Sequence, residues 1–255
     1  MKITANIITL NEERNIEDAV RSAQRVCDEV LVVDSGSDDD TVKIAKSLGA
    51  KVIEQPYLGD GAQKAFGAPH ASYDWILSLD ADERLDEDAV AAIQALDLKN
   101  SKYDAYSFAR KTFVGDAFIK LWYPDRVTRL YNRTKCGFSS AGGHARVESD
   151  NAYALDAHLL HYSYEDYAQM IKTTHKFITR GAKLAYEEGK RAKAYDPLLH
   201  GLGALFKALI LKRGVFHGID GLNVAIISAF SSYMKYALML EMQRNKTKSS
   251  PTDKK

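Results

Sequence analysis

The chain has 255 residues, of which 45% are apolar and 27% charged, and its formal net charge at pH 7 is +1. These proportions are those of a globular protein with a substantial core, so they exclude general disorder, collagen-like repeats and a small disulfide scaffold. Cys27 and Cys136 lie far apart without metal-ligand spacing, which predicts a reducing, cytoplasmic setting. Because the sequence has no secretory pattern and no unbroken run of about 18 apolar residues, we expect neither secretion nor a transmembrane helix.

Charge is distributed unevenly along the chain. Residues 1–150 contain 19 basic and 25 acidic residues, whereas residues 151–255 contain 16 basic and 9 acidic residues. Such a difference predicts two regions with different roles. A basic region can face nucleic acid or an anionic membrane. Because the basic region is also rich in apolar residues, we favour the membrane and expect no nucleic-acid partner.

The first 113 residues alternate strand and helix patterns, which predicts βαβ units and a mainly parallel sheet. The expected strands are Ile3–Leu10, Glu29–Asp34, Lys51–Glu54, Trp75–Asp80 and Ala105–Phe113. The expected helices between them are Ile16–Val26, Thr41–Leu48, Gly61–Ala71 and Asp86–Leu96. Farther on, the pattern is less regular, and we expect short strands at Arg129–Asn132 and Ala157–Ser163.

From Glu165 onward the sequence predicts helices. Glu165–Glu188 is charged, whereas Leu198–Leu211 and Gly221–Leu240 are apolar almost all round and must be buried in protein or lie in lipid. The nearby basic residues favour an anionic membrane surface, with packing on the sheet or on a partner subunit as the alternative; they are Lys207, Lys212, Arg213 and Lys235. We therefore expect an α/β domain in residues 1–163, a helical, membrane-associating appendage in residues 164–244 and a disordered tail in residues 245–255.

Carboxylates follow two of the expected parallel strands, at the end of the sheet where ligands bind in such folds. Asp80 ends the expected strand Trp75–Asp80 and Asp82 lies two residues beyond it, and hard oxygen ligands at this place suit Mg²⁺ or Mn²⁺ bound to phosphates. Asp34 ends the neighbouring strand and could accept hydrogen bonds from a base or ribose. Either group could instead close a turn, and Asp86 could cap the helix that follows. The sequence lacks the glycine-rich motifs of dinucleotide-dependent oxidoreductases and P-loop ATPases.

Three segments, in order, resemble family 2 inverting glycosyltransferases with the GT-A fold. They are Ile7–Ile16, Val32–Thr41 and Leu77–Glu83. The extension of the third segment by Arg84, together with Trp122–Asp125, Arg129-Leu130 and His161–Tyr164, is similar to the branch that adds glucose to heptose in the lipopolysaccharide inner core. This resemblance extends from about residue 3 to about residue 240 and implies a GT-A nucleotide-sugar-binding fold followed by a helical appendage.

The resemblance also implies an activity, which is the metal-dependent transfer of a hexose, glucose from UDP-glucose, to a lipopolysaccharide core or related lipid-linked glycan. Asp34 would contact the nucleobase, and Thr9 and Glu12 would line the same pocket. Asp80 would contact the ribose or diphosphate, and Asp82 would bind the Mg²⁺ or Mn²⁺ ion. The protein would be cytoplasmic and peripheral on the inner face of the cytoplasmic membrane.

Two basic residues are further candidates for binding the nucleotide sugar. Lys64 precedes the fourth strand and could equally be a surface lysine. Arg129 could bind a diphosphate in a bidentate manner or belong to an exposed basic strand edge.

The general base is the part of the pattern in which this chain departs from the resembling branch. That branch usually has a His-Glu pair near a loop of small residues, but here His144 is followed by Ala145. Glu148, Asp125 and His144 can each accept a proton, and the sequence does not rank them. The departure leaves a catalytically inactive nucleotide-sugar binder or a membrane scaffold as an alternative. A nucleotidyltransferase is another, although the basic glycine-rich loop that it would need is absent from the sequence.

Overall fold

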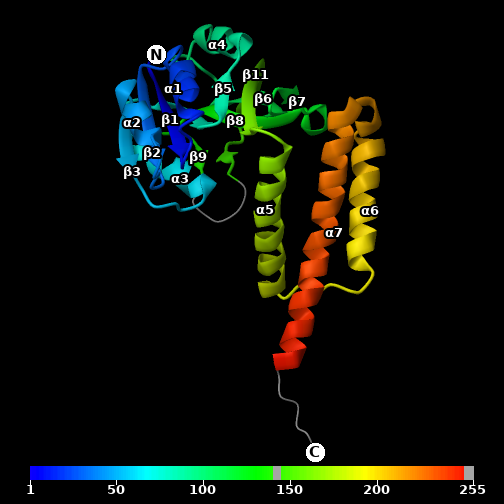
Figure 1. Cartoon of the computed structure of the whole chain (residues 1–255). Coiled ribbons are helices and arrows are strands. Elements are labelled where there is room, and N and C mark those ends of the chain that lie inside the picture. The colour runs from blue at the N-terminus through cyan, green and yellow to red at the C-terminus, as the bar shows by residue number, and fades with distance from the viewer. Residues whose placement is uncertain (140–144, 250–255) are drawn as a thin grey trace, which may run out of the picture. The chain divides into compact units, whose positions relative to one another are not determined.

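The computed structural model describes residues 1–139 and 145–249 (Figure 1). The chain forms two compact units. The first consists of Met1–Thr112 and Tyr123–Ser163, and the second consists of Phe113–Trp122 with the chain from Tyr164 onward. The change of unit after Ser163 lies at the end of the expected α/β domain, but residues 113–122 belong to the second unit rather than to the first.

The first unit contains a mixed sheet whose N-terminal part is parallel. Strands β1 (Ile3–Thr9), β2 (Glu29–Asp34), β3 (Lys51–Glu54) and β4 (Trp75–Asp80) pair in parallel in the order β3-β2-β1-β4. The sheet continues in the order β8-β6-β11-β5 through β8 (Asp125–Asn132), β6 (Ala105–Val114), β11 (Ala152–Tyr164) and β5 (Glu83–Leu85). This arrangement confirms the expected α/β fold.

Three of these strands differ from the expected ones. β8 and β11 begin earlier than Arg129 and Ala157. In β11, the exposed Asp156 lies between the buried Leu155 and Ala157, as in an antiparallel strand with one face exposed to solvent. β5 is only three residues long and pairs antiparallel with β11. A small hairpin of β9 (Gly137–Phe138) and β10 (Val147–Glu148) lies outside the main sheet, and β7 (Ala117–Phe118) pairs with β6.

Helices cover both faces of the parallel strands. Helices α1 (Ile16–Gln24), α2 (Thr41–Ser47) and α4 (Glu87–Gln94) share one apolar core with Trp75, Leu77 and Leu79 of β4. Asp86 caps α4 by accepting a hydrogen bond from the backbone N–H of Ala89. Helix α3 (Asp60–Gly67) and the short 3₁₀ helix Ala68–His70 lie on the other side, with Ile76. Because side chains alternate along a strand, Asp80 points to the α3 side.

The second unit is built on three helices, α5 (Tyr167–Glu187), α6 (Asp196–Phe206) and α7 (Gly218–Ser249). Helix α7 packs against both α5 and α6, and the turns Lys207–Leu211 and Gly214–Phe216 join α6 to α7 (Figure 1). Gly201 allows α6 to approach α7, because a Cβ at this position would lie 3.1 Å from the Cβ of Tyr233. Helix α7 continues to Ser249, so it extends into the segment expected as a disordered tail. No helix among the described residues is long and apolar enough to cross a membrane.

Candidate active site

The carboxyl ends of β1, β2 and β4 bring three of the expected site residues to one edge of the sheet. The strand register places Thr9 opposite Asp34 and Ile8 opposite Asp80. The turn from β4 to β5 then presents Asp82 and is closed by a hydrogen bond of 3.1 Å from the Asp80 N–H to Glu83. The Asp80 and Asp82 side chains remain 28% and 21% exposed, so both carboxylates can reach a ligand from solvent.

Buried cations neutralise one of these two aspartates. Lys64 Nζ lies 2.8 Å from Asp80 Oδ1, and Arg129 Nη2 lies 3.0 Å from Asp80 Oδ2. The side chains of Lys64 and Arg129 are only 1% and 5% exposed. The alternatives of a surface lysine and an exposed basic strand edge are therefore wrong. Burial lowers the pKa of Lys64, although Asp80 partly opposes this effect.

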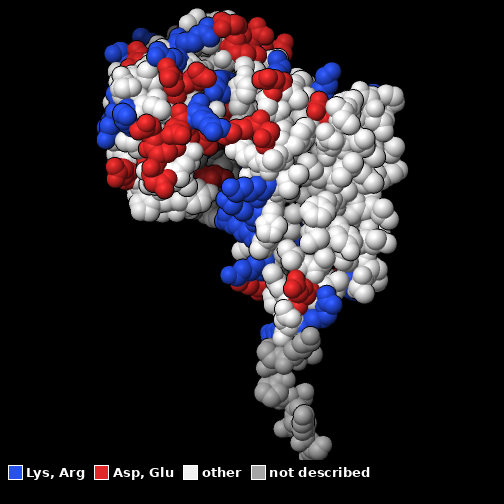
Figure 2. Space-filling model, viewed as in Figure 1, with Lys and Arg blue, Asp and Glu red and all other residues white. Residues whose placement is uncertain are grey.

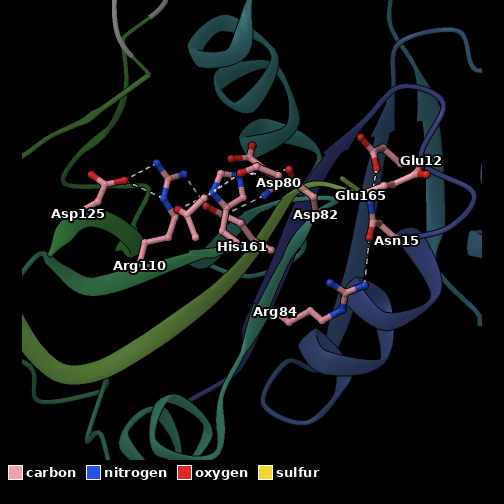
Figure 3. A network of polar contacts seen from close by, with 12 residues as sticks. Glu12, Asn15, Asp80, Asp82, Arg84, Arg110, Asp125, His161 and Glu165 are labelled. Atoms are coloured by element: carbon pink, nitrogen blue, oxygen red, sulfur yellow. Dashed lines mark hydrogen bonds and ion pairs between the residues drawn. The ribbon is translucent and has the colours of Figure 1, made fainter. Parts of the chain in front are cut away.

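Glu83 organises the arginines of the site. Its side chain is completely buried and accepts two hydrogen bonds of 2.7 Å from Arg129 and one of 3.1 Å from Arg110. Burial alone would raise the pKa of Glu83, but the guanidinium of Arg129 holds it well below its usual range. Arg110 also contacts Asp125, with its Nε 2.9 Å from Asp125 Oδ2 (Figure 3). Glu83 therefore stays ionised and fixes the direction of both guanidinium groups.

These side chains line a cavity of about 530 Å³. Lys64, Asp80, Arg110, Asp125 and Arg129 contribute to its wall, together with Arg126 and Arg146. Its volume is within the range of small-molecule sites, and cations outnumber carboxylates in its lining. Such a site suits an anionic ligand whose oxygens can accept hydrogen bonds from guanidinium groups.

His161 contacts the second aspartate. Its Nε2 lies 3.2 Å from Asp82 Oδ2 (Figure 3), and its Nδ1 lies 3.2 Å from Thr112 Oγ1. Burial would lower the pKa of this imidazole, but the hydrogen bond and charge of Asp82 raise it overall. Sequence reasoning assigned His161 no role. The register of β11 against β5, which places His161 opposite Glu83, brings it to the site.

Three further expected residues lie at the ends of β1 and β2. Burial raises the pKa of the Glu12 carboxyl, and the nearby Asp82 and Asp80 carboxylates raise it further. Asp34 is almost completely buried and accepts hydrogen bonds of 2.9 Å from the N–H groups of Gly36 and Ser37. It therefore also closes its own turn. Thr9 is buried, and its hydroxyl has no hydrogen-bond partner among the described residues.

The structure separates the three candidates for the general base. Asp125, at the start of β8, lines the cavity that contains Asp80 and Arg129. Glu148, on β10, is exposed and lines a different hollow, together with Lys135 and Asp104. His144 lies outside the described residues.

Comparisons with known proteins identify the family. The family described as "Glycosyl transferase family 2" matches residues 4–153. The chain belongs to this family. An uncharacterised glycosyltransferase of Rickettsia typhi is 31% identical over 94% of this chain and 87% of its own length. The lipopolysaccharide core biosynthesis glycosyltransferase LpsC of Rhizobium meliloti is 27% identical over 98% of this chain and 96% of its own length.

A solved structure agrees with the fold of this family 2 glycosyltransferase. The crystal structure of Staphylococcus aureus TarS superposes with a TM-score of 0.50, covering 89% of this chain and 55% of that one, at 16% identity. At this level of identity the likeness supports the GT-A fold alone.

The residues of the glycosyltransferase fit a divalent cation at Asp82. Both oxygens of Asp80 already contact protein cations, whereas Asp82 contacts an imidazole, which is itself a metal ligand when neutral. A carboxylate suits Mg²⁺ or Mn²⁺. A second group of possible ligands, Asp86, Asp88 and His158, lies at α4. The Asp86 carboxylate caps α4 and also lies 3.7 Å from Lys111, and these two contacts explain its position without a bound metal.

The buried position of Glu83 predicts a large effect on stability. In Glu83→Gln, Arg129 and Arg110 would lose a buried anionic partner, so we expect the free energy of unfolding to fall by about 3 kcal/mol. Glu87→Gln is a matched control, because Glu87 also pairs with an arginine through two hydrogen bonds, of 2.7 and 2.6 Å, but is 82% exposed. Urea unfolding should distinguish the two variants. Equal midpoints would contradict the role of Glu83.

Proposed function

We propose that this glycosyltransferase transfers a hexose with inversion, glucose from UDP-glucose, to a lipopolysaccharide core or related lipid-linked glycan. The observation that carries the proposal is the juxtaposition of the Asp82–His161 pair with a cation-rich cavity that contains Lys64, Asp80 and Arg129. Such a cavity is suited to a diphosphate. The similarity to LpsC, a lipopolysaccharide core biosynthesis glycosyltransferase, supports a lipopolysaccharide core as the acceptor.

Each group at the site has a role in this proposal. Thr9, Glu12 and Asp34 bind the nucleobase side of the donor at the ends of β1 and β2. Lys64 and Arg129, positioned by Asp80 and Glu83, supply positive charge beside the diphosphate. Asp82 and His161 would hold a Mg²⁺ or Mn²⁺ ion, which would supply further positive charge beside the departing nucleoside diphosphate.

Asp125 is the proposed general base, because it lines the same cavity as Asp80 and Arg129. The acceptor hydroxyl oxygen forms a bond to the anomeric carbon, and its proton passes to the Asp125 carboxylate. The bond from the anomeric carbon to the diphosphate oxygen breaks, and the diphosphate leaves with the electron pair. Arg110 orients Asp125 through the hydrogen bond from its Nε.

The second unit supports a lipid-linked acceptor. Leu198, Leu202 and Phe206 on α6 and Ile226 and Phe230 on α7 are more than half exposed. So much exposed apolar surface on two adjacent helices is typical of a site that contacts a membrane or another protein. We propose that residues 198–240 lie on the inner face of the cytoplasmic membrane, where the appendage formed by residues 164–244 would hold the enzyme close to its acceptor.

Ligand binding and turnover test this function. UDP-glucose with Mn²⁺ should raise the melting temperature, because a ligand at 100 times its Kd stabilises the folded state by about 2.7 kcal/mol. Slow release of glucose from UDP-glucose should also require Mn²⁺. Stabilisation without turnover, even with a lipopolysaccharide acceptor, would favour the catalytically inactive binder. A shift with another nucleotide sugar but none with UDP-glucose would contradict the proposed donor.

A further inference from the structure

Helix α5 carries its basic residues in one row. Lys172, Lys176, Arg180 and Lys183 are all exposed. At 3.6 residues per turn they lie within about 80° of one another around the helix axis, along about 16 Å of its length. We call these four residues the basic stripe.

The basic stripe has a defined place on an amphipathic helix. The residues that α5 buries are Met170, Ile178, Ala182 and Ala185, and they lie on the side of the helix away from the stripe. Phe177 and Leu184 lie next to the stripe and are 61% and 47% exposed. Helix α5 therefore presents cations and large apolar side chains side by side to its surroundings.

The described residues offer the basic stripe little internal neutralisation. Lys183 lies 3.9 Å from Glu187, and none of the described carboxylates forms an ion pair with Lys172, Lys176 or Arg180. Like charges one helical turn apart repel each other, so the spacing does not stabilise α5 itself. The stripe is thus available to an external anion.

The basic stripe of α5 lies next to an apolar surface on the neighbouring helices α6 and α7. Figure 2 shows Lys and Arg gathered over α5, next to a surface over α6 and α7 that is almost free of charged residues. The large apolar side chains that are exposed on α6 and α7 include Leu202, Phe206, Ile219 and Phe230. Cations beside exposed apolar side chains are typical of helices that lie in the interface of an anionic membrane.

We propose that the basic stripe of α5 binds the anionic phospholipid headgroups of the bilayer on which α6 and α7 dock. This inference rests on the membrane surface proposed for residues 198–240 and adds to it a second helix, which supplies the selectivity for anionic lipid. The apolar side chains of α6 and α7 enter the interface of any bilayer, whereas the stripe attracts only a negatively charged one.

Vesicle binding tests the basic stripe in the full-length protein. Lys172→Gln/Lys176→Gln/Arg180→Gln removes three cations and keeps residues that favour a helix. On vesicles of phosphatidylglycerol and phosphatidylcholine, we expect this variant to bind on the order of 100-fold more weakly than the wild type. On pure phosphatidylcholine, the two proteins should bind equally. The matched control, Lys46→Gln/Lys99→Gln/Lys102→Gln, removes the same charge from exposed positions of the first unit and should behave as the wild type.

The possible outcomes separate the proposals. Equal binding of the triple variant and the wild type to anionic vesicles would overturn the role of the stripe, as would a wild type without preference for anionic lipid. A wild type that binds neither vesicle would overturn the membrane surface as well. Release of glucose from UDP-glucose, measured in the same samples, reports on the proposed transferase activity independently. If the triple variant folds poorly, salt provides a second test. In 1 M salt the wild type should lose its preference for anionic vesicles, because the Debye length falls to about 3 Å.

Discussion

Replacing Asp82 with alanine should abolish glycosyl transfer and metal-dependent nucleotide binding while the protein stays folded. Asp82 lies in the turn after β4, where its carboxylate contacts the imidazole of His161. The substitution of Asp82 would remove a metal ligand from a partly exposed turn rather than a side chain from the core. Because a bound metal contributes several kcal/mol to the stabilisation of a departing anion, we expect kcat to fall on the order of 10³-fold.

The Asp82 experiment needs a control for the loss of one negative charge. Asp156→Ala serves this purpose, since Asp156 is exposed on β11 and the residues on either side of it are buried. Both variants should unfold at the temperature of the wild type, and only Asp82→Ala should lose the stabilisation by UDP with Mn²⁺. Full activity of Asp82→Ala at saturating Mn²⁺ would show that Asp82 is not a metal ligand.

The second large effect is expected at the general base. Asp125→Asn should lower kcat by a factor on the order of 10² or more and leave the affinity for the donor unchanged, because an amide cannot accept the acceptor proton at neutral pH. Glu148→Gln should retain the rate of the wild type, since Glu148 lines a hollow other than the one that contains Asp80. Steady-state kinetics with varied UDP-glucose would measure both parameters.

A pH profile distinguishes chemistry from positioning at Asp125. Asp125 also contacts Arg110, so Asp125→Asn could act by releasing this guanidinium. If Asp125 is the base, the acidic limb of the kcat profile should disappear in the variant, whereas a displaced Arg110 would lower the rate at every pH alike. A large loss of kcat in Glu148→Gln with Asp125→Asn active would assign the proton transfer to Glu148.

The sequence alone predicted most of the parallel half of the sheet. Continuous apolar runs such as Val30–Val33 are typical of strands covered on both faces, and β1, β2, β3 and β4 lie within one residue of their expected bounds. A parallel sheet places the carboxyl ends of its strands together, so the grouping of Thr9, Asp34 and Asp80 also followed from the sequence. These features depend on local patterns, which a sequence displays directly.

Only the tertiary structure placed the other half of the site. Nothing local to Lys64 or Arg129 indicates that both side chains are buried against Asp80, and Glu83 looks like a surface residue until Arg129 and Arg110 enclose it. His161 reaches Asp82 because β11 pairs with β5, a strand of three residues that no pattern predicts. Contacts of this kind depend on strand register and on the pairing of buried charges between residues far apart in the chain, and neither leaves a periodic signal in the sequence.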